Sequence, residues 1–313
     1  MEARGIGVSR PAVSRRLEAP SPRYGEKLIF AALAACAILS VVTTTAIVIA
    51  LIGPTIGFFG DVPLFDFLFG TEWAPAFEPA SFGVLPLVVG TLMVTLWGMV
   101  FAIPIGLGAA IYLSEYANPR VRKVIKPILE ILAGIPTVAI GFFCVAFITP
   151  EILQKIFPSA GIFLVLSAGL GIGLMCVPII ASISEDAMRA VPGGLREGAY
   201  AMGATKMRVA TRVVFPAALS GIVASIVLAI SRAAGETMIV VLAAGSTPNI
   251  TFNPLEAIQA MTAYIAVTAT GEIAQGTTKY DTIFAVGALL FVITLVMNLI
   301  SIRLVRRFRE VYE

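Results

Sequence analysis

Residues 184–216 read SEDAMRAVPGGLREGAYAMGATKMRVATRVVFP, and this stretch is the longest polar, basic interruption between two apolar segments of the chain. Its content of Ala, Met, Arg and Glu predicts helix, broken at Pro192-Gly193-Gly194 and again near Gly203. The helix between the two breaks carries small residues, which let the surface of another protein approach closely. A solvated charged loop would not need this small-residue face, so we interpret the stretch as a compact projecting knob that docks on a partner.

The rest of the chain is strongly apolar. Of its 313 residues, 58% are hydrophobic and 13% are charged, whereas soluble proteins carry about 25% charged residues. The mean hydropathy is +0.95, and several continuous apolar runs exceed the roughly 20 residues that a helix needs to cross a bilayer. The composition therefore excludes an ordinary soluble domain and predicts an all-α, polytopic membrane protein.

Six membrane-spanning helices are expected from the apolar runs, at about residues 27–53, 83–113, 128–149, 160–183, 217–245 and 281–302. All but three of the 22 Lys and Arg residues fall in the N-terminal segment, the connector 114–127, the 184–216 stretch or the C-terminal tail. Because Lys and Arg concentrate in cytoplasmic loops, we expect both termini and the 184–216 stretch in the cytoplasm. Residues 1–26 lack an apolar period and are expected to form a disordered basic tail before a six-helix domain over 27–313.

The chain offers little for catalysis. It contains no histidine, which removes the commonest general base and metal ligand. It also has no HExxH or GxSxG motif and no convergent pair of acids, so a membrane-embedded enzyme has almost no support. Cys36, Cys144 and Cys176 stand alone inside apolar runs without CxxC spacing. We therefore expect inert buried thiols and no metal site.

The spacing Glu197-x-Ala199-x3-Gly203-x12-Pro216 resembles the EAA loop of ABC-importer permeases, with Gly198 at a position where that family usually has Ala. The resemblance implies a type I importer permease fold with six helices. It also implies that the helix ending at Gly203 is a coupling helix, which sits in a groove of a separate ATPase subunit and receives the movement that ATP drives there. The chain itself would then be a non-catalytic transport subunit.

The chain shows no ATP site of its own. The interval from Gly198 to Gly203 has the glycine spacing that begins a P-loop, but Ala204 stands where the required Lys would be. No other segment has a Walker-like pattern, so the energy source is expected on another chain. We therefore expect no cofactor on this chain, with ATP and Mg²⁺ on the partner ATPase.

The fifth apolar run contains an unexpected polar segment, residues 231–238, which reads SRAAGETM. An Arg near the bilayer centre costs about 2.5–3.5 kcal/mol. Arg232 and Glu236 are four residues apart, hence on one helix face and able to pair. One interpretation is a self-neutralising structural pair, or an Arg that reaches to the interface. We favour a substrate pathway that also includes Thr237, in which Arg232 binds a passing oxyanion and Glu236 orients the guanidinium.

The RAAGETM segment, residues 232–238, is similar to the corresponding segment of the permeases of the phosphate-specific Pst importers. Residues 67–95, 129–142 and 284–298 resemble the C-type subunit of that system in particular. This resemblance implies a permease of an ATP-driven phosphate importer in the bacterial cytoplasmic membrane. Its implied partners are a sister permease, a dimer of ATPase subunits, an extracytoplasmic phosphate-binding protein and the lipid bilayer, with no nucleic acid.

Two alternatives to phosphate import remain open at this point. The first is the same machine carrying another oxyanion, such as molybdate, sulfate or phosphonate. The second is a secondary transporter driven by an ion gradient, which would not need a docking helix and would usually show more intramembrane carboxylates than Glu236.

Two smaller expectations concern the helices around the polar stretch. Glu130 is expected to be a structural partner of the basic residues in the connector 114–127, rather than a functional group. The pattern Gly169-x3-Gly173 fits a close helix contact, although such a pattern arises easily by chance in a chain with 28 glycines.

Overall fold

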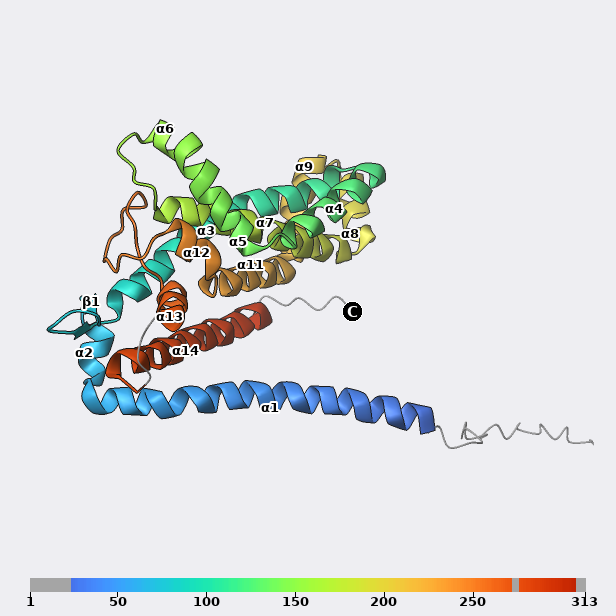
Figure 1. Ribbon diagram of the computed structural model, residues 1–313. Helices are drawn as coiled ribbons and strands as arrows, with labels where there is room; N and C mark the ends of the chain where they lie inside the picture. Colours follow the sequence, from blue (N-terminus) through green and yellow to red (C-terminus); the bar gives the residue numbers. More distant parts are fainter. Residues whose placement is uncertain (1–23, 272–275, 308–313) are drawn as a thin grey trace, which may run out of the picture. The chain divides into compact units, whose positions relative to one another are not determined.

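The computed structural model describes residues 24–271 and 276–307, and it is almost entirely helical (Figure 1). By its internal contacts the chain divides into two units, residues 1–49 and residues 50–313. Helix α1 covers Tyr24–Asp61, and its N-terminal part belongs to the first unit. The large apolar side chains of that N-terminal part are exposed. The predicted tail therefore falls mostly on residues 1–23, outside the described residues, and its last three residues form the first turn of α1.

The second unit begins in α1 and contains all the other elements. They are α2 (Leu64–Phe69), β1 (Trp73–Ala74), β2 (Ser81–Phe82), α3 (Leu85–Ile111), η1 (Tyr112–Tyr116), α4 (Pro119–Ala133), α5 (Thr137–Phe143), η2 (Cys144–Leu153), α6 (Gln154–Ile156), α7 (Val165–Ala190), α8 (Gly193–Ala201), α9 (Lys206–Val209), η3 (Ala210–Val214), α10 (Phe215–Ala217), α11 (Leu219–Ala234), α12 (Met238–Ala243), α13 (Met261–Thr270) and α14 (Thr278–Arg307). The η elements are π-helical segments.

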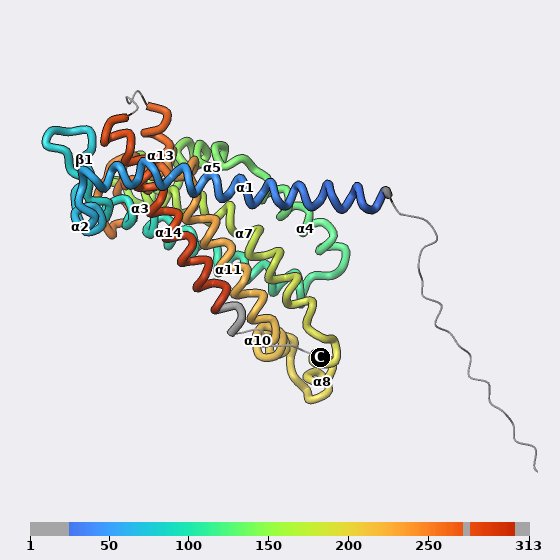
Figure 2. Tube along the Cα trace, turned by 90° about the horizontal axis from the view of Figure 1, so that it is seen from below, coloured from blue at the N-terminus to red at the C-terminus, as the bar shows by residue number. Residues whose placement is uncertain are grey.

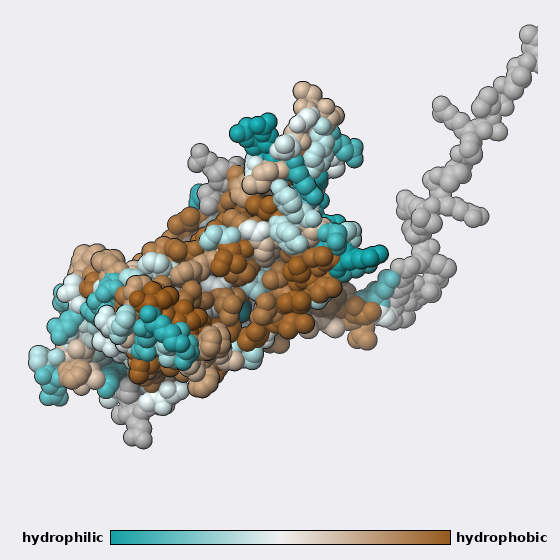
Figure 3. All heavy atoms as spheres, turned by 90° about the horizontal axis from the view of Figure 1, so that it is seen from above, coloured by the Kyte–Doolittle hydropathy of each residue, from teal (hydrophilic) through white to brown (hydrophobic). Residues whose placement is uncertain are grey.

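Within the described ranges, five helices are long and apolar enough to cross a membrane. A sixth span results if the helix over 206–217 and α11, which meet at an angle of 72°, are counted together. Hydrophobic side chains cover the middle of the face drawn in Figure 3, and hydrophilic ones gather at its left edge and on the projection at the top. The expected all-α, multi-pass architecture is therefore confirmed, with two short strands as its only β-structure among the described residues.

Two of the six expected spans are interrupted. The third was expected as one helix over 128–149, but α4 starts at Pro119, where the Asn118 side chain accepts a hydrogen bond from the Val121 N–H at 2.8 Å, and it ends at Ala133. Helix resumes only after Pro136, because proline lacks the N–H that continues a helix. The fifth span, expected over 217–245, is likewise broken after Ala234.

Helices α3 and α7 make the tightest packing in the second unit, and α7, α11 and α14 run side by side (Figure 2). Glycines bring the α3 and α7 backbones close together. A Cβ built on Gly169 of α7 would lie 2.7 Å from the Cβ of Trp97, and one on Gly173 would lie 3.1 Å from the Cβ of Phe101. The Gly169-x3-Gly173 pattern therefore does mark a close helix contact.

An aromatic cluster packs between the end of α1 and the start of α3, in the interval between the first two expected spans. Phe58 makes edge-to-face contacts with Phe67 and Phe82 at centroid distances of 5.5 and 5.6 Å. Trp73 makes a similar contact with Tyr264 of α13 at 4.9 Å. The end of α1, α2 and the short β-ribbon thus pack against α3, α13 and α14 as part of the core.

Replacing Gly169 with Ala should lower the stability of the protein, because the new methyl group meets the Trp97 Cβ and the α3 backbone. Overpacking of this kind costs about 1–3 kcal/mol, and it should appear as a lower Tm of the detergent-solubilised protein. The control is Gly108→Ala on α3, where a Cβ meets nothing within 4 Å. An unchanged Tm for Gly169→Ala would contradict the close contact.

Candidate functional site

The 184–216 stretch is divided between a membrane helix and a projecting knob. Residues up to Ala190 belong to α7, so the knob starts seven residues later than its polar composition suggested. Val191 is the C-cap of α7, and Pro192 precedes the first residue of α8 with φ −55° and ψ 135°. The predicted break at 192–194 is therefore real, since the extended Pro192 separates the two helices.

The second predicted break, at Gly203, has a clear backbone cause. Gly203 has φ +78°, a left-handed conformation that glycine adopts without steric cost. The Ala204 N–H donates to the Ala199 carbonyl at 3.0 Å, and the Gly203 N–H donates to the Tyr200 carbonyl at 2.9 Å. This pair of hydrogen bonds is a Schellman motif, which satisfies carbonyls left free at the end of α8.

The knob presents small and apolar residues outward. Glu197, Gly198 and Gly203 are exposed, and a Cβ built on either glycine meets nothing within 4 Å. Ala199 is half-buried instead, and it packs against the hydrophobic cluster beneath α8. Among the predicted docking residues, Ala199 thus supports the knob from inside while the others line its outer surface.

Sequence reasoning missed Met202, whose side chain is 88% exposed beside Gly203. Tyr200 and Met207 on the same knob are also exposed. Exposed large apolar side chains beside small residues are typical of protein-binding surfaces. The signal was present in the sequence as Tyr and Met within an otherwise polar stretch.

Pro216 lies in α10, close to the sharpest bend of this region. The helix over 206–217 and α11 meet at 72°, with Ala218 between them. Proline has no N–H to donate and disturbs the preceding turn, where the π-helical η3 ends at Val214. Pro216 therefore contributes to the corner at which the knob returns to the membrane-spanning part of the chain.

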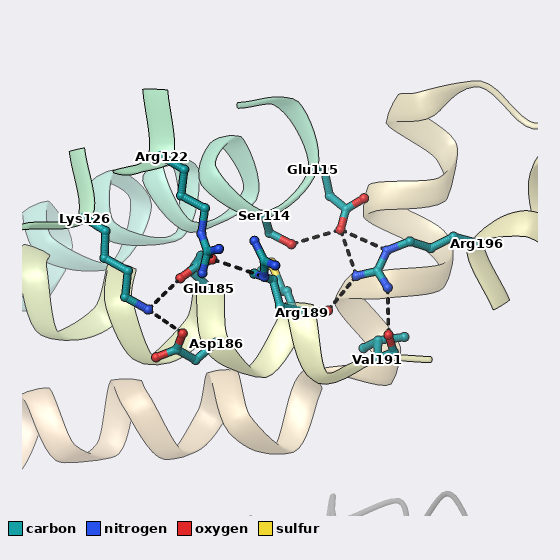
Figure 4. Close-up of polar contacts among 10 residues, drawn as sticks. Ser114, Glu115, Arg122, Lys126, Glu185, Asp186, Arg189, Val191 and Arg196 are labelled. Atoms are coloured by element: carbon teal, nitrogen blue, oxygen red, sulfur yellow. Dashed lines mark hydrogen bonds and ion pairs between the residues drawn. The ribbon is translucent and has the colours of Figure 1, made fainter. Parts of the chain in front are cut away.

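A buried carboxylate sits beside the knob at the end of α7 (Figure 4). Glu185 is fully buried and is paired with Arg122 at 2.7 Å and with Lys126 at 3.0 Å, both on α4. Lys126 also bonds Asp186, and Arg189 lies 3.8 Å from Glu185. The partners of these α4 cations are thus on α7, which differs from the expectation that Glu130 pairs with the connector.

The ion pairs keep Lys126 protonated. Burial acts to lower the pKa of Lys126, but the hydrogen bonds to Asp186 and Glu185, together with their negative charges, raise it further than burial lowers it. The net pKa lies above the ordinary value of 10.5. The contribution of this pairing to stability is therefore complete below pH 10.5 and is lost only as the pH rises through the higher folded-state pKa.

The polar segment of the fifth span lies at a helix break. Arg232 is in the last turn of α11 and is exposed, where its charge interacts favourably with the negative end of that helix. Just before it, the Ser231 hydroxyl donates to Asn298 Oδ1 of α14 at 2.8 Å, beside a groove of about 430 Å³ between the two helices. The guanidinium of Arg232 thus lies at the surface of this chain, whereas the groove is lined by Ser231 and Asn298.

Glu236 does not make the contact that its sequence position suggested. Its Oε1 accepts hydrogen bonds from the N–H groups of Met238 at 3.0 Å and Ile239 at 3.3 Å, and so caps α12. An ion pair with Arg232 is not found, because α11 ends at Ala234 and the two residues no longer share one helix face. Thr237 is half-buried at the N-cap of α12, and the Glu236 carbonyl accepts from Thr262.

In the part of the chain that the structure describes, no group of three or more His, Cys, Asp or Glu side chains is placed to hold a metal ion. Cys144 and Cys176 are buried, whereas Cys36 is exposed. The candidate site comprises the exposed Arg232, the helix break capped by Glu236 and the knob over 191–217.

The chain matches a known protein family. A family model described as "Binding-protein-dependent transport system inner membrane component" matches residues 102–310, which is more than half of the chain. The chain belongs to this family. The match includes α8, Pro216 and the segment from Arg232 to Thr237.

Three relatives cover most of the chain. The "Probable ABC transporter permease protein YqgH" of Bacillus subtilis (strain 168) is 34% identical over 275 residues, with 87% of both chains covered. The "Phosphate transport system permease protein PstC" of Pasteurella multocida is 32% identical and covers 79% of this chain and 81% of the relative. The protein of the same name from Mesorhizobium japonicum is 31% identical and covers 93% and 94%, respectively.

Solved structures show the same fold. A chain of a bacterial alginate ABC transporter, crystallised with an alginate-bound periplasmic protein, superposes with a TM-score of 0.66 at 18% identity, covering 91% of this chain and 96% of that one. A chain of the MetNI methionine ABC transporter in an inward-facing conformation gives a TM-score of 0.53 at 22% identity, covering 73% and 95%. The chain is thus an ABC-importer permease of type I fold, similar to the C-type phosphate permeases and, like its relatives, a non-catalytic transport subunit.

Replacing Gly203 with Ala should destabilise the end of α8 by about 1–2 kcal/mol, because a Cβ is unfavourable in the left-handed conformation. Hydrogen exchange of the amides in residues 193–204 should speed up accordingly. The matched control is Gly198→Ala, whose Cβ meets nothing in the helix and which should slow exchange slightly through its better helix propensity. Equal exchange in both variants would contradict the role of Gly203.

Replacing Glu185 with Gln should lower the stability by about 2 kcal/mol, because Arg122, Lys126 and Arg189 then lose their shared counter-charge. The loss should stay below the about 3–5 kcal/mol of a fully buried pair, since Arg122 and Lys126 keep side-chain exposures of 26% and 23%. Asp186→Asn is the control, because Asp186 is 59% exposed and such pairs contribute about 0–1 kcal/mol. The measurement is the Tm of both purified variants, and similar values would count against the buried pair.

Proposed function

We propose that this chain is a permease subunit of an ATP-driven importer that moves inorganic phosphate into the cytoplasm. The observation that carries the proposal is the similarity to phosphate transport system permeases from several bacteria, at about 30% identity over most of the chain. The relative that is 34% identical carries no substrate in its name. The choice of phosphate therefore also needs support from the chemistry of the chain.

Arg232 supplies that support. A guanidinium presents parallel N–H donors that match two oxygens of a phosphate, and it stays charged at every physiological pH. Arg232 is exposed at the end of α11. Glu236, four residues further along the chain, uses its carboxylate to accept hydrogen bonds from two backbone N–H groups of α12. Among residues 24–271 and 276–307 no carboxylate is paired with Arg232, so the guanidinium is available for an anion, and Thr237 adds a hydroxyl at the same break.

The revised role of Glu236 is to hold the break in place. Its carboxylate satisfies two N–H groups at the start of α12, which would otherwise lack partners in an apolar setting. The Thr262 hydroxyl of α13 donates to the Glu236 carbonyl at 2.7 Å and anchors the same turn. Glu236 thus positions the end of α11, and with it Arg232, through the backbone and not through an ion pair.

The orientation and partners follow from the charge distribution and the knob. The excess of Lys and Arg in the knob and both tails supports a chain with its termini and α8 in the cytoplasm. The exposed surface of α8, with Glu197, Gly198, Gly203 and Met202, would then dock in a groove of an ATPase subunit that binds ATP and Mg²⁺. A sister permease, a second ATPase copy and an extracytoplasmic binding protein complete the assembly in the bacterial cytoplasmic membrane.

A second candidate cargo is another oxyanion, such as molybdate, sulfate or phosphonate, because the same guanidinium fork binds any of them. Uptake of [32P]phosphate into proteoliposomes that hold the complete transporter decides between them. Unlabelled phosphate should compete, and molybdate and sulfate should not. Absence of [32P]phosphate uptake, together with ATP-dependent uptake of labelled sulfate or molybdate by the same proteoliposomes, would transfer the assignment to that anion.

Replacing Arg232 with Ala should reduce phosphate uptake by at least about tenfold, because a lost charged hydrogen-bond partner typically costs about 1.5–3 kcal/mol. Arg232→Lys should retain part of the activity, since lysine keeps the charge but not the fork. Lys155→Ala, which removes an exposed ion pair with Glu151, is the control and should transport normally. Normal uptake by Arg232→Ala in a stably assembled complex would end the assignment.

A further inference from the structure

The base of α8 is held by one side chain, Arg196, which contacts two other elements (Figure 4). Its Nη1 donates to the Val191 carbonyl and its Nη2 to the Met188 carbonyl, both at 2.7 Å. These carbonyls belong to the end of α7, where a cation is favourable because the last carbonyls of a helix lack helical partners. Arg196 therefore fixes α8 against the end of α7.

The same guanidinium reaches across to Glu115, in the π-helical segment η1 that continues α3. Glu115 Oε1 accepts from Arg196 Nη2 at 3.1 Å and from Nε at 3.3 Å, and the Ser114 hydroxyl donates to the same oxygen at 2.9 Å. The side chain of Glu115 is 5% exposed and that of Arg196 is 20% exposed. An ion pair this buried keeps its geometry, since separating the charges would leave each without its partner in a poorly polar surrounding.

Arg196 thus joins three elements at one point. The chain connects α8 directly to α7 through Val191 and Pro192, but α3 and α8 are more than eighty residues apart in sequence. The polar contact between them is made by Arg196 and Glu115, above the small apolar cluster that includes Ala110 and Met188. A displacement of α8 therefore reaches α7 through the backbone and α3 through this ion pair.

We propose that Arg196 and Glu115 form the mechanical tie that delivers the movement of α8 to α3, so that α3 and α7 move as one body. This inference rests on the proposed function, in which α8 receives the movement of an ATPase. Neither residue touches the cargo or ATP, so both are positioning residues. The closely packed glycine contact between α3 and α7 then carries the movement along the membrane-spanning helices.

A tie and a merely stabilising contact predict different results. Loss of a merely stabilising contact would lower the amount of assembled transporter, and the transporters that remain would carry as much phosphate per ATP as before. Loss of a tie would let the ATPase turn over without moving α3, so phosphate carried per ATP would fall in assembled complexes. The ratio of phosphate transported to ATP hydrolysed therefore separates the two roles.

The experiment reconstitutes the complete transporter, with its ATPase and binding protein, into proteoliposomes and measures both rates. In Arg196→Ala and in Glu115→Ala, phosphate carried per ATP should fall by about tenfold, within the 5–150-fold range typical of coupling between sites. The double variant should be no worse than Arg196→Ala alone, because that variant already removes the contact with Glu115. Arg196→Lys should give a ratio of phosphate to ATP between those of the wild type and Arg196→Ala, since one ammonium cannot reach Glu115 and both α7 carbonyls together.

Two further variants separate loss of the ion pair from loss of assembly. Glu115→Gln preserves the shape and one acceptor oxygen but removes the charge, so it should assemble normally even if the alanine variants do not, and phosphate per ATP should still fall. Lys155→Ala, on an exposed ion pair, should match the wild type. A wild-type ratio in Glu115→Gln and in every assembled Arg196 variant overturns the tie, whereas a wild-type complex without coupled phosphate transport overturns the proposed function.

Discussion

The close approach of α3 and α7 is the constraint on which the rest of the second unit depends. Glycines at 98, 169 and 173 leave no room for side chains between the two backbones, and helix contacts in membranes rely on such close packing because burial of apolar surface gives no advantage in lipid. The contact sets the register of the two helices. It thereby sets the positions of their ends, where η1 continues α3 and α8 follows α7.

Two buried carboxylates, Glu185 and Glu115, lie near those helix ends. Glu185 connects α7 to α4, and Glu115 connects η1 to α8. A buried carboxylate is tolerated only where cations and hydrogen-bond donors surround it, and both carboxylates meet this condition through residues on neighbouring elements. Polar contacts therefore join α3, α4, α7 and α8 at one end, whereas apolar and aromatic packing joins the elements at the other.

Among the described residues, the interruption between α11 and α12 is stabilised by hydrogen bonds to the backbone and not by ion pairs. A helix break inside an apolar segment exposes backbone groups that must find partners. Here the Glu236 carboxylate and the Thr262 hydroxyl satisfy the turn, and Arg232 stands at the negative end of α11. The Glu236 carboxylate is thus used by the backbone of α12 and, within the described ranges, does not pair with the Arg232 guanidinium.

Much of this arrangement was determined by local sequence. The number of spans follows from apolar runs, since crossing a bilayer requires about 20 such residues, and the ends of α8 follow from Pro192 and Gly203, since their backbone chemistry permits little else. The split of the third span at Gly134 and Pro136 was not predicted, because such residues are often tolerated inside membrane helices. The tertiary structure alone decided that Glu185 and not Glu130 pairs with α4, that Glu236 caps a helix, and that Arg196 meets Glu115 from 81 residues away. The physical reason is that an ion pair depends on which helix ends meet in space, and this is set by the packing of α3 against α7.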